Sequence, residues 1–460
     1  MTADELQRAL VDLLGAAHVS RDEQELDAHG GRPEFGSEFG SRRPDVVVFP
    51  ADAEQVSVVC GFASGAGVPV VVMGTGTAVG GATLPLHGGI SLDLRELNQI
   101  HDVSPADLTA TVGAAVTRKA LNRRLARDGL FFPVDPGADA SLGGMAATNA
   151  SGSRAMRYGA MRANVLALQA VLGDGSIVRT GTRASKSSAG YDLTRLLVGS
   201  EGTLGVITEL TLRTTPIPAV VVSARAVFAD NDAALRVVAA FRAQGLAVSR
   251  LEFLDGPTMA MVNDYRGTDY PALPTLFIEI GASEPTATGD IAAARRIAET
   301  EGAVRFELER EPDAQERLWE ARHLVGFAVQ ARAPDKEVIG TDVCVPSSEL
   351  LGAIAFARDL LDERGMEASV IAHAGDGNYH LTFNIDRDDA AELERFHGLY
   401  RELVAHALAR GGTCSGEHGI GLAKIDFLEQ EHGDLMPAMR AIKRGLDPAG
   451  ILNPGKVMRV

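Results

Sequence analysis

Short apolar runs alternate with amphipathic stretches before residue 216, and this alternation predicts a domain of mixed strands and helices. The β-rich runs predict strands at Val46–Phe49, Val68–Met73, Ile90–Leu94, Thr109–Val112 and Gly205–Leu212. Helical spacing is found near Asp4–Leu14, Ala53–Ser64 and Val116–Arg127. Val165–Leu172 and Ile177–Thr180 flank the turn Gly173-Asp174-Gly175, which is typical of a hairpin.

The pattern changes around Thr214–Pro218, after which strand-then-helix units of similar size follow one another. The predicted strands are Val220–Phe228, Leu251–Leu254, Thr275–Ile280 and Val304–Leu308, and the predicted helices are Asp232–Gln244 and Asp290–Thr300. This order favours an antiparallel sheet with helices on one face, and therefore a second domain. We expect an α+β protein with domains at residues 1–216 and 217–410, and a segment 411–460 that returns to the first domain.

Composition limits the kinds of partner. The chain has 460 residues, which is long for one core and indicates two or three domains. It is 45% hydrophobic and 23% charged, as soluble globular proteins are. A formal net charge of -17 argues against binding to nucleic acid or to anionic lipid, both of which require clustered cations. A small anionic substrate stays possible, because a local basic pocket can outweigh the global field.

The compartment is predicted from the N-terminus and the cysteines. Met1–Glu5 is acidic and lacks the layout of a signal peptide, and the longest apolar runs are strand-sized, so no transmembrane segment is expected. Cys60, Cys344 and Cys414 are widely spaced and form no CxxC pair. They indicate buried thiols in a reducing environment, and we expect a cytoplasmic protein.

Glycine-rich segments dominate the first domain. They are Met73–Gly81, Pro133–Gly152 and Gly199–Ile207. Glycine lets backbone N–H groups approach a diphosphate or a flat ligand closely. The first segment is not a usual dinucleotide motif, because GxGxxG would require glycine at Val79. A simple turn explains any one of these segments nearly as well, but three in one domain indicate a cofactor.

A second group of candidate functional residues combines histidines with a carboxylate. His373 and His380 are separated by a glycine-containing turn that can bring both rings to one point, and Glu417-His418 follows between glycines. Two imidazoles and one carboxylate form a common ligand set for a divalent metal, with His418 left as a base. Asp376 could add a ligand, but Asp-Gly more often only makes a turn. Structural histidines are the alternative, and clustering favours the metal.

Arg322 has two interpretations. It lies in a helical stretch with Trp319, and its guanidinium could clamp a substrate carboxylate. Spacing alone favours the simpler alternative, which is an exposed ion pair with Glu316 or Glu320.

These motifs carry a family resemblance from about Arg43 to Val457. The segments around Gly74, Gly143, Tyr158-Gly159 and Gly202 resemble the FAD-binding domain of the vanillyl-alcohol oxidase and p-cresol methylhydroxylase superfamily. Its D-lactate and glycolate dehydrogenase branch is resembled by three further segments, which are His373–His380, Glu417–Gly419 and Leu452–Lys456. Finer motifs similar to the cytochrome-type D-lactate dehydrogenases are Arg250–Asp255, Ile339–Pro346 and Gly412–Glu417.

The resemblance implies a fold and a set of site residues. The fold is a two-subdomain FAD-binding domain of p-cresol methylhydroxylase type, an antiparallel, ferredoxin-like substrate (cap) domain and a C-terminal helical segment. The implied FAD-binding residues are Met73, Gly74, Thr75, Gly76, Thr77, Gly80, Pro136, Gly137, Ser141, Gly143, Gly144, Thr148, Gly152, Glu201, Gly202, Gly205, Ile207 and Asn453. His373, His380 and Glu417 would hold a zinc or manganese ion. Arg322 would bind the substrate carboxylate, against the simpler interpretation above, and His418 would be the catalytic base.

The implied reaction is the oxidation of a D-2-hydroxy monocarboxylate, such as D-lactate or a longer homologue, by hydride transfer to flavin N5. The first glycine loop lacks the histidine of the covalent members, which implies non-covalent FAD. Lysine and asparagine, which bind a second carboxylate in D-2-hydroxyglutarate dehydrogenases, are replaced by Gly340 and Thr382.

Alternatives are a D-2-hydroxyglutarate or glycolate dehydrogenase, an alkyl-dihydroxyacetone-phosphate synthase, and a non-catalytic FAD-binding electron-transfer subunit. The electron acceptor could be a quinone, a cytochrome or an electron-transferring flavoprotein, and a peripheral position at the membrane is compatible with each.

Overall fold

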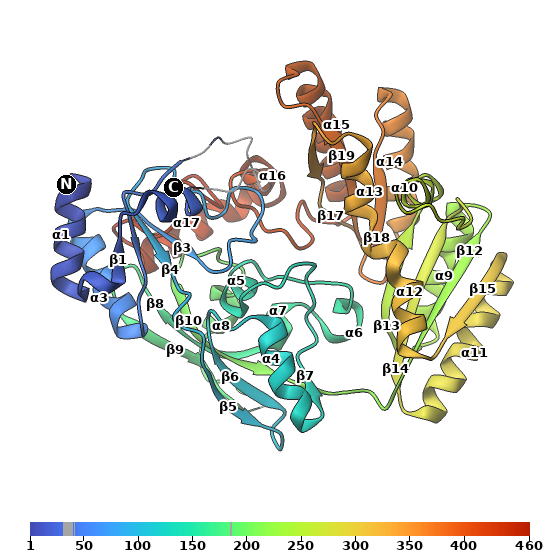
Figure 1. Cartoon of the computed structure of the whole chain (residues 1–460), viewed down its shortest axis with the longest axis horizontal. Helices are drawn as coiled ribbons and strands as arrows, with labels where there is room; N and C mark the ends of the chain where they lie inside the picture. The colour runs from blue at the N-terminus through green and yellow to red at the C-terminus, as the bar shows by residue number, and fades with distance from the viewer. Residues whose placement is uncertain (31–39, 41, 185) are drawn as a thin grey trace. The chain divides into compact units, whose positions relative to one another are not determined.

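The computed structural model describes residues 1–30, 40, 42–184 and 186–460, and the chain divides into two compact units. Unit 1 contains residues 1–151, 159–217 and 417–460, and unit 2 contains residues 152–158 and 218–416. Most elements of both units are labelled in Figure 1. Helices and antiparallel sheets occur together, so the predicted α+β class is confirmed.

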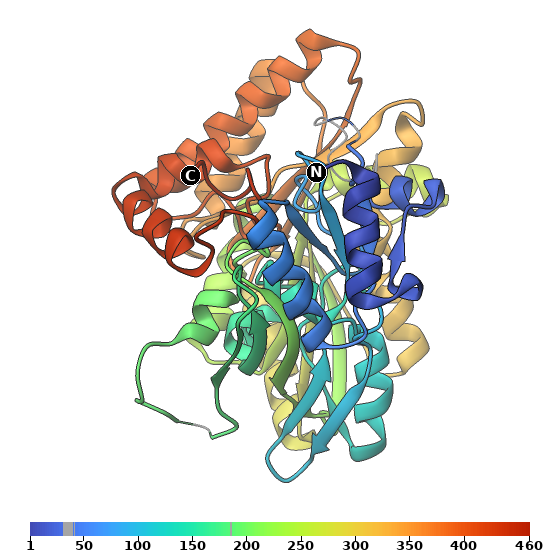
Figure 2. The ribbon, with the colours of Figure 1, turned by 90° about the vertical axis from the view of Figure 1, so that its left-hand side faces the viewer.

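The first sheet of unit 1 is mainly parallel. Its strands lie in the order β1 (Val19–Ser20), β2 (Val46–Val48), β4 (Ile90–Asp93) and β3 (Val70–Met73), with β2, β4 and β3 parallel. The helices around it are α1 (Ala3–Leu14), α2 (Glu23–Ala28) and α3 (Ala53–Ala66). Thr2 and Glu5 form a capping box that begins α1, and Asp52 caps α3. In Figure 2, α1 and α3 lie side by side in blue.

The second sheet of unit 1 is antiparallel. Its order is β5 (Ile100–Ser104), β6 (Thr109–Gly113), β10 (Val206–Arg213), β8 (Val165–Val171) and β9 (Ile177–Gly181). The predicted hairpin is therefore confirmed as β8 and β9, while β5 was not predicted. Helix α3 contacts β8 and β9, and one apolar core runs through both sheets.

Short elements connect the sheets of unit 1. They are η1 (Ala16–His18), α4 (Arg118–Leu125), η3 (Ala126–Asp128), β7 (Leu130–Phe131), α5 (Leu142–Ala147), α7 (Met161–Asn164), α8 (Leu193–Leu197) and β11 (Thr215–Pro216), which pairs with β7. Helix α6 (Ala155–Tyr158) belongs instead to unit 2.

The C-terminal segment completes unit 1 with α16 (Ile425–His432), η4 (Gly433–Leu435) and α17 (Met436–Leu446). Beyond α17 the chain runs beside β3, because the Val70 amide donates to the Ile451 carbonyl and the Asn453 amide donates to the Val70 carbonyl, both at 2.8 Å. Lys443 fixes this arrangement. Its buried Nζ contacts Asp447 and donates to the carbonyls of Thr203 and Leu452 at 2.8 Å each.

Unit 2 is built on an antiparallel sheet. Its described strands lie in the order β15 (Ala303–Glu309), β12 (Val220–Phe228), β14 (Thr275–Ala282), β13 (Val248–Leu254), β18 (Ser369–His373), β19 (Asn378–Ile385) and β16 (Glu337–Gly340), and β17 (Val343–Cys344) also pairs with β19. The first strands follow the order β15-β12-β14-β13, which is the strand order of a ferredoxin-like β-α-β-β-α-β unit.

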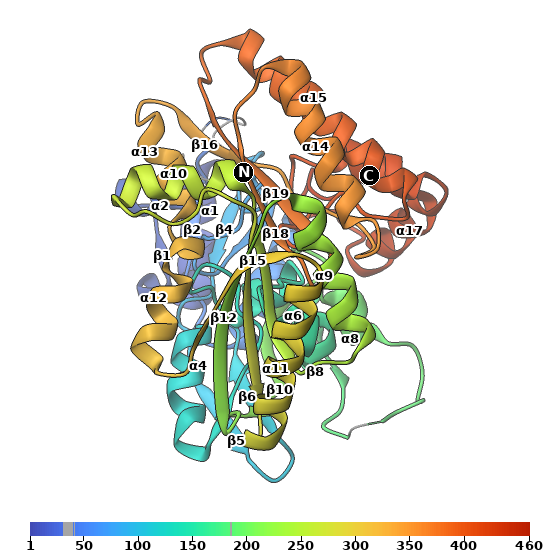
Figure 3. The ribbon, with the colours of Figure 1, turned by 90° about the vertical axis from the view of Figure 1, so that its right-hand side faces the viewer.

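Helices cover both faces of this sheet, which corrects the expectation of one covered face. Helices α9 (Asn231–Ala243) and α11 (Glu284–Thr300) contact β12, and they contact each other. The other face packs through Leu254, Phe277 and Ile371 against α10 (Gly256–Arg266), α12 (Pro312–His323) and α13 (Val325–Arg332). Helix α14 (Leu350–Arg364) lies beside α15 (Ala390–Ala409), as Figure 3 shows.

Within the described ranges, every helix is too short or too polar to span a bilayer.

The buried Lys443 pair leads to a stability prediction. Lys443→Met removes the donor shared by Asp447 and the two carbonyls, and it leaves a buried carboxylate without its cation. We expect a loss of about 3–5 kcal/mol in the free energy of unfolding, measured by urea denaturation. Lys119→Met, at an exposed position on α4, is the matched control and should change stability by less than about 0.5 kcal/mol. Equal stability of the two variants would contradict the role of Lys443.

Candidate functional site

A cavity of about 330 Å³ lies in unit 1, and the three glycine-rich segments form much of its wall. The predicted FAD-binding residues that line it are Gly74, Thr75, Gly76, Thr77, Pro136, Gly137, Ser141, Gly143, Gly144, Thr148, Glu201, Gly202, Gly205, Ile207 and Asn453. Met73, Gly80 and Gly152 do not line it, and Gly152 begins the short segment that belongs to unit 2. Segments far apart in sequence are therefore brought together, as the resemblance implies.

Close backbone packing explains the glycines of this wall. A Cβ atom on Gly74 would lie 2.3 Å from the Ser141 hydroxyl oxygen, so glycine lets the first two segments meet. A Cβ on Gly143 would lie 2.6 Å from the Cβ of Ala114, which follows β6. Without side chains at these positions, helix α5 can pack against the second sheet while its first turn stays beside the cavity.

The same cavity wall contains Glu417 and His418. Both residues follow the boundary between Gly416, the last residue of unit 2, and the C-terminal segment of unit 1. The predicted base therefore lies in the wall of the predicted cofactor cavity, within one compact unit.

In unit 2, a tight turn brings His373 and His380 together. The turn joins β18 to β19, and the ring centroids lie 5.5 Å apart in an edge-to-face arrangement. Gly377 has a φ of +82°, and a Cβ there would lie 2.0 Å from the Val345 carbonyl oxygen, so the turn requires glycine. The proximity of the two rings follows from this turn, as the spacing predicts.

Glu252 on β13 contacts two of the predicted site residues, His373 and Arg322. Its carboxylate is buried, and it accepts a hydrogen bond from His373 Nδ1 at 2.7 Å and another from Arg322 Nε at 2.8 Å. Burial would raise the pKa of Glu252, but the interactions with His373 and Arg322 outweigh it and hold the pKa below its usual value. A histidine that donates through Nδ1 carries its lone pair on Nε2, so Glu252 selects the tautomer that can bind a metal.

This ion pair also corrects the simpler interpretation of Arg322. Helix α12 does place Trp319 and Arg322 one turn apart, but Arg322 pairs across the unit with Glu252. Glu320 instead pairs with Arg266 at the surface.

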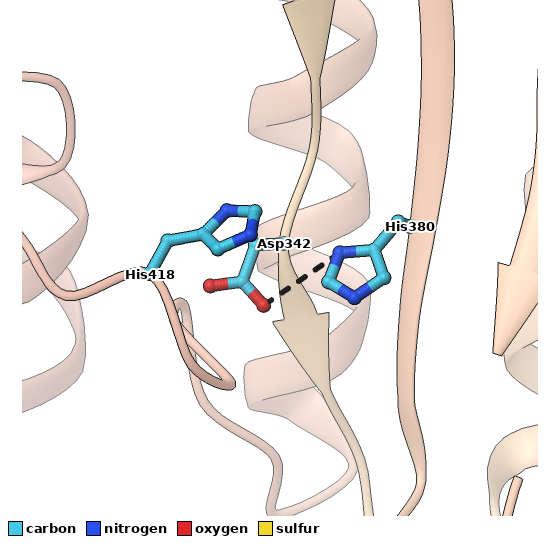
Figure 4. A group of neighbouring side chains, drawn as sticks. All are labelled: Asp342, His380 and His418. Carbon is cyan, nitrogen blue, oxygen red and sulfur yellow. Dashed lines mark ion pairs between the residues drawn. The ribbon is translucent and has the colours of Figure 1, made fainter. Parts of the chain in front are cut away.

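Asp342 is a second buried carboxylate in unit 2. Figure 4 shows it beside His380, whose Nδ1 lies 3.9 Å from Asp342 Oδ1 and donates to the Thr341 carbonyl at 3.0 Å. Asn378 Nδ2, the Ser415 hydroxyl and the Gly416 amide donate to Asp342 at 2.8, 3.0 and 3.1 Å. Asp342 therefore holds the chain that leads directly into Glu417. Figure 4 also labels His418, which belongs to unit 1.

Cations are concentrated around these carboxylates despite the acidic chain. Glu279 lies within 3.3 Å of Arg154 and 3.6 Å of Arg250, and Arg250 stacks over the Trp319 ring. Burial opposes ionisation of Glu279, but Arg250 and Arg154 lower its pKa. With Arg322 and Glu252, this region is locally basic and suits an anionic substrate.

Sequence reasoning gave no role to Glu252 or Asp342. Both stand in segments that carry the family resemblance, Arg250–Asp255 and Ile339–Pro346, but their partners are remote in the chain: Glu252 contacts His373, and Asp342 contacts Gly416. Alternation could have indicated Glu252, since it shares a sheet face with Arg250 on β13. The other unpredicted residues that line the cavity are Val72, Ala78, Val79, Ala82, Thr83, Leu94, Ala114, Ala138, Ala140, Met145, Ala147, Ala150, Ser151 and Val206.

Comparisons with known proteins agree with this geometry. Residues 44–181 match the model for an FAD binding domain, and residues 217–457 match the model for the C-terminal domain of FAD linked oxidases. The chain belongs to the FAD-linked oxidase family. It is therefore an FAD-linked oxidoreductase, and unit 1 supplies the FAD-binding domain.

Individual relatives extend over most of the chain. A probable mitochondrial D-lactate dehydrogenase of Danio rerio is 41% identical over 91% of this chain and 85% of its own length. A mitochondrial D-lactate dehydrogenase (cytochrome) of Arabidopsis thaliana is 40% identical over 93% of this chain and 76% of its own length. The solved structure of p-cresol methylhydroxylase with substrate bound has a TM-score of 0.80 and 18% identity, over 99% of this chain and 96% of that chain. This structural likeness confirms the predicted type of fold.

A substitution in the cavity wall tests its role. Gly144 faces the cavity from α5, where the nearest atom to an added Cβ is the Ser141 hydroxyl at 3.0 Å. Gly144→Val should raise the dissociation constant of FAD by ~10-fold or more, which corresponds to at least about 1.4 kcal/mol. Flavin content per chain, read from the absorbance spectrum, measures the effect. Gly65→Val, at an open position on α3, is the control; equal flavin content in the two variants would contradict the assignment.

Proposed function

We propose that this protein is an FAD-dependent dehydrogenase that oxidises a D-2-hydroxy monocarboxylate, D-lactate or a longer homologue, to the 2-oxo acid. The observation that carries the proposal is the buried Glu252, which holds both Arg322 and His373. One carboxylate thereby orients a carboxylate-binding group and a metal-type imidazole in the same unit. The names of the Danio rerio and Arabidopsis thaliana relatives support D-lactate as the first substrate to test.

The proposed cofactor is non-covalent FAD. The first glycine-rich segment, Met73–Gly81, contains no histidine, and its residues 74–79 line the cavity with small side chains or backbone. When bound there, FAD would supply the two-electron acceptor of the reaction. The protein supplies the position of the ring and the exclusion of water.

We also propose that His373, His380 and Glu417 hold a divalent zinc or manganese ion. Both imidazoles donate through Nδ1 to protein acceptors, which places the lone pair of each ring on Nε2. Glu417 directly follows Gly416, whose amide is bonded to Asp342. This donor set suits zinc or manganese about equally, and such an ion would lower the pKa of a bound hydroxyl.

Arg322 and His418 would bind the substrate and accept its proton. Arg322 would bind the substrate carboxylate, since its guanidinium offers further donors beyond the Nε bonded to Glu252. His418 would accept the proton of the 2-hydroxyl at the wall of the cavity. The proton leaves the 2-hydroxyl oxygen and the hydride leaves C2, so the product is a 2-oxo acid.

Two positions favour a monocarboxylate. Gly340 on β16 and Thr382 on β19 are register partners, and neither carries a cation or a carboxamide for a second carboxylate. D-2-hydroxyglutarate is therefore a weaker candidate than D-lactate. The name of the Arabidopsis thaliana relative favours a cytochrome as the electron acceptor.

Anaerobic reduction of the flavin tests the reaction directly. We expect D-lactate or a longer D-2-hydroxy acid to bleach the flavin absorbance, while the L-enantiomers do not. Pretreatment with a chelator should slow bleaching by ~100-fold, and zinc or manganese should restore it. If all these acids fail to bleach the metal-loaded holoenzyme, the substrate assignment is wrong.

The base is tested in the same assay. His418→Ala should retain FAD but slow bleaching by ~100-fold or more, the usual contribution of a positioned base. His397→Ala, at an exposed position on α15, is the matched control and should behave as wild type.

The role of Glu252 gives a separate prediction. Glu252→Gln keeps the shape of the side chain but offers one oxygen to two donors, so either His373 or Arg322 loses its acceptor. We expect metal affinity to fall by ~10–100-fold and KM for the hydroxy acid to rise. Metal content and steady-state kinetics are the measurements. Glu320→Gln on α12, which alters the surface pair with Arg266, is the control; unchanged metal content in Glu252→Gln would refute this role.

A further inference from the structure

We propose that Glu201 is a positioning residue that fixes the loop carrying Glu417 and His418 in the wall of the cofactor cavity. This inference rests on the proposed function, since it concerns the proposed ligand Glu417 and the proposed base His418. Glu201 was expected to contact the cofactor, and it does line the cavity. The side chain of Glu201 also accepts hydrogen bonds within unit 1, and the inference is argued from these bonds.

Both carboxylate oxygens of Glu201 are occupied by one turn of the loop. Oε1 accepts a hydrogen bond from the Ile420 amide at 2.7 Å, and Oε2 accepts one from the Gly421 amide at 2.8 Å. Glu201 is 6% exposed, so these bonds are shielded from water. Two charge-assisted bonds to successive amides define the direction of the backbone two residues after His418.

Burying the Glu201 carboxylate removes it from water at a cost in free energy, so the contacts that hold it there have to compensate. Burial raises the pKa of Glu201, while the two amides and the buried lysines Lys424 and Lys456 act in the opposite direction. Two amide donors, one to each oxygen, favour the ionised form of this carboxyl. A buried carboxylate whose two oxygens both accept hydrogen bonds from one loop is well suited to hold that loop in place.

The loop is shaped to lie against Glu201. Gly419 has a φ of +80°, and a Cβ there would lie 2.9 Å from Glu201 Oε1. Gly421 approaches the first glycine-rich segment so closely that a Cβ would lie 2.4 Å from the Gly80 carbonyl oxygen. The Leu422 amide donates to the same Gly80 carbonyl at 2.8 Å. Gly80 does not line the cavity itself, but it anchors the loop that does.

The backbone of Glu201 is fixed by the cavity wall. Its amide donates to the Ala147 carbonyl at the end of α5 at 2.8 Å. Its carbonyl accepts from Asn453 Nδ2 at 2.7 Å, and the residue has a positive φ of 51°. Lys456 Nζ in turn donates to Asn453 Oδ1 at 2.5 Å. Glu201 therefore connects three parts of the cofactor cavity to the loop that follows His418.

Glu201→Gln tests this connection in the full-length holoenzyme. Glutamine offers one oxygen to two amides, and its NH₂ group would face an N–H donor. We expect flavin content to stay near that of wild type, amide hydrogen exchange in the peptide 417–421 to accelerate by ~10-fold or more, and kcat with D-lactate to fall ~10-fold or more at nearly unchanged KM. Exchange and flavin content are readouts that do not depend on turnover.

Two further variants sharpen the test. Gly419→Ala pushes a methyl group towards Glu201 Oε1 without altering the carboxylate, and it should reproduce the faster exchange and lower kcat even if Glu201→Gln folds poorly. Glu209→Gln on β10, which pairs with His101 at the surface, is the matched control and should leave exchange, flavin content and kcat unchanged.

The outcomes separate this inference from the proposed function. Unchanged exchange at residues 417–421 in Glu201→Gln would overturn the inference, and so would loss of FAD with a normal kcat in the flavin-loaded fraction. If no 2-hydroxy acid reduces the wild-type flavin, the proposed function fails, and the exchange measurement still decides whether Glu201 holds the loop. His418→Ala should abolish turnover with normal exchange, which distinguishes loss of the base from loss of its position.

Discussion

A carboxylate buried in a protein keeps its charge only where donors surround it, and the functional parts of this chain depend on that constraint. Glu252 accepts hydrogen bonds from Arg322 and His373. It fixes the direction of the Arg322 guanidinium and the tautomer of His373. Glu201 is met by two successive amides of the loop after His418. In both cases, the geometry needed to satisfy a buried charge is the geometry that positions the groups proposed to react.

The features of the fold and of the site that could be predicted are those that depend on residues close together in the sequence. The glycine-rich segments around Gly74 and Gly143 indicated a cofactor, because repeated small residues have few other uses near strand ends. The turn between His373 and His380 indicated that two rings meet, because Gly377 permits a backbone that other residues rarely adopt. Strand β12 and helix α1 follow the expected bounds closely, since a run rich in apolar residues marks the strand and a capping box begins the helix.

The parts that escaped prediction depend on contacts between distant residues. The spacing around Arg322 favoured a neighbour on its own helix, yet its partner is Glu252 on another element. Strand β5 was missed because it is short and carries the polar residues His101 and Asp102, and α10 was missed between two apolar strands. Helices on the second face of the unit 2 sheet were missed for a related reason. On this face the buried apolar residues Phe277 and Leu254 stand beside the charged Glu252, so the sequence does not mark the face as apolar.

The boundary between the two units falls at a chemically significant point in the chain. Gly416 is held in unit 2 by Asp342, and Ile420 is held in unit 1 by Glu201, so the two residues between Gly416 and Gly419 are tied at both ends. These residues are Glu417 and His418. Each buried carboxylate orders the backbone within its own unit, and the cost of that ordering is met during folding rather than during substrate binding. The proposed ligand and the proposed base thus lie directly between two anchored stretches of backbone.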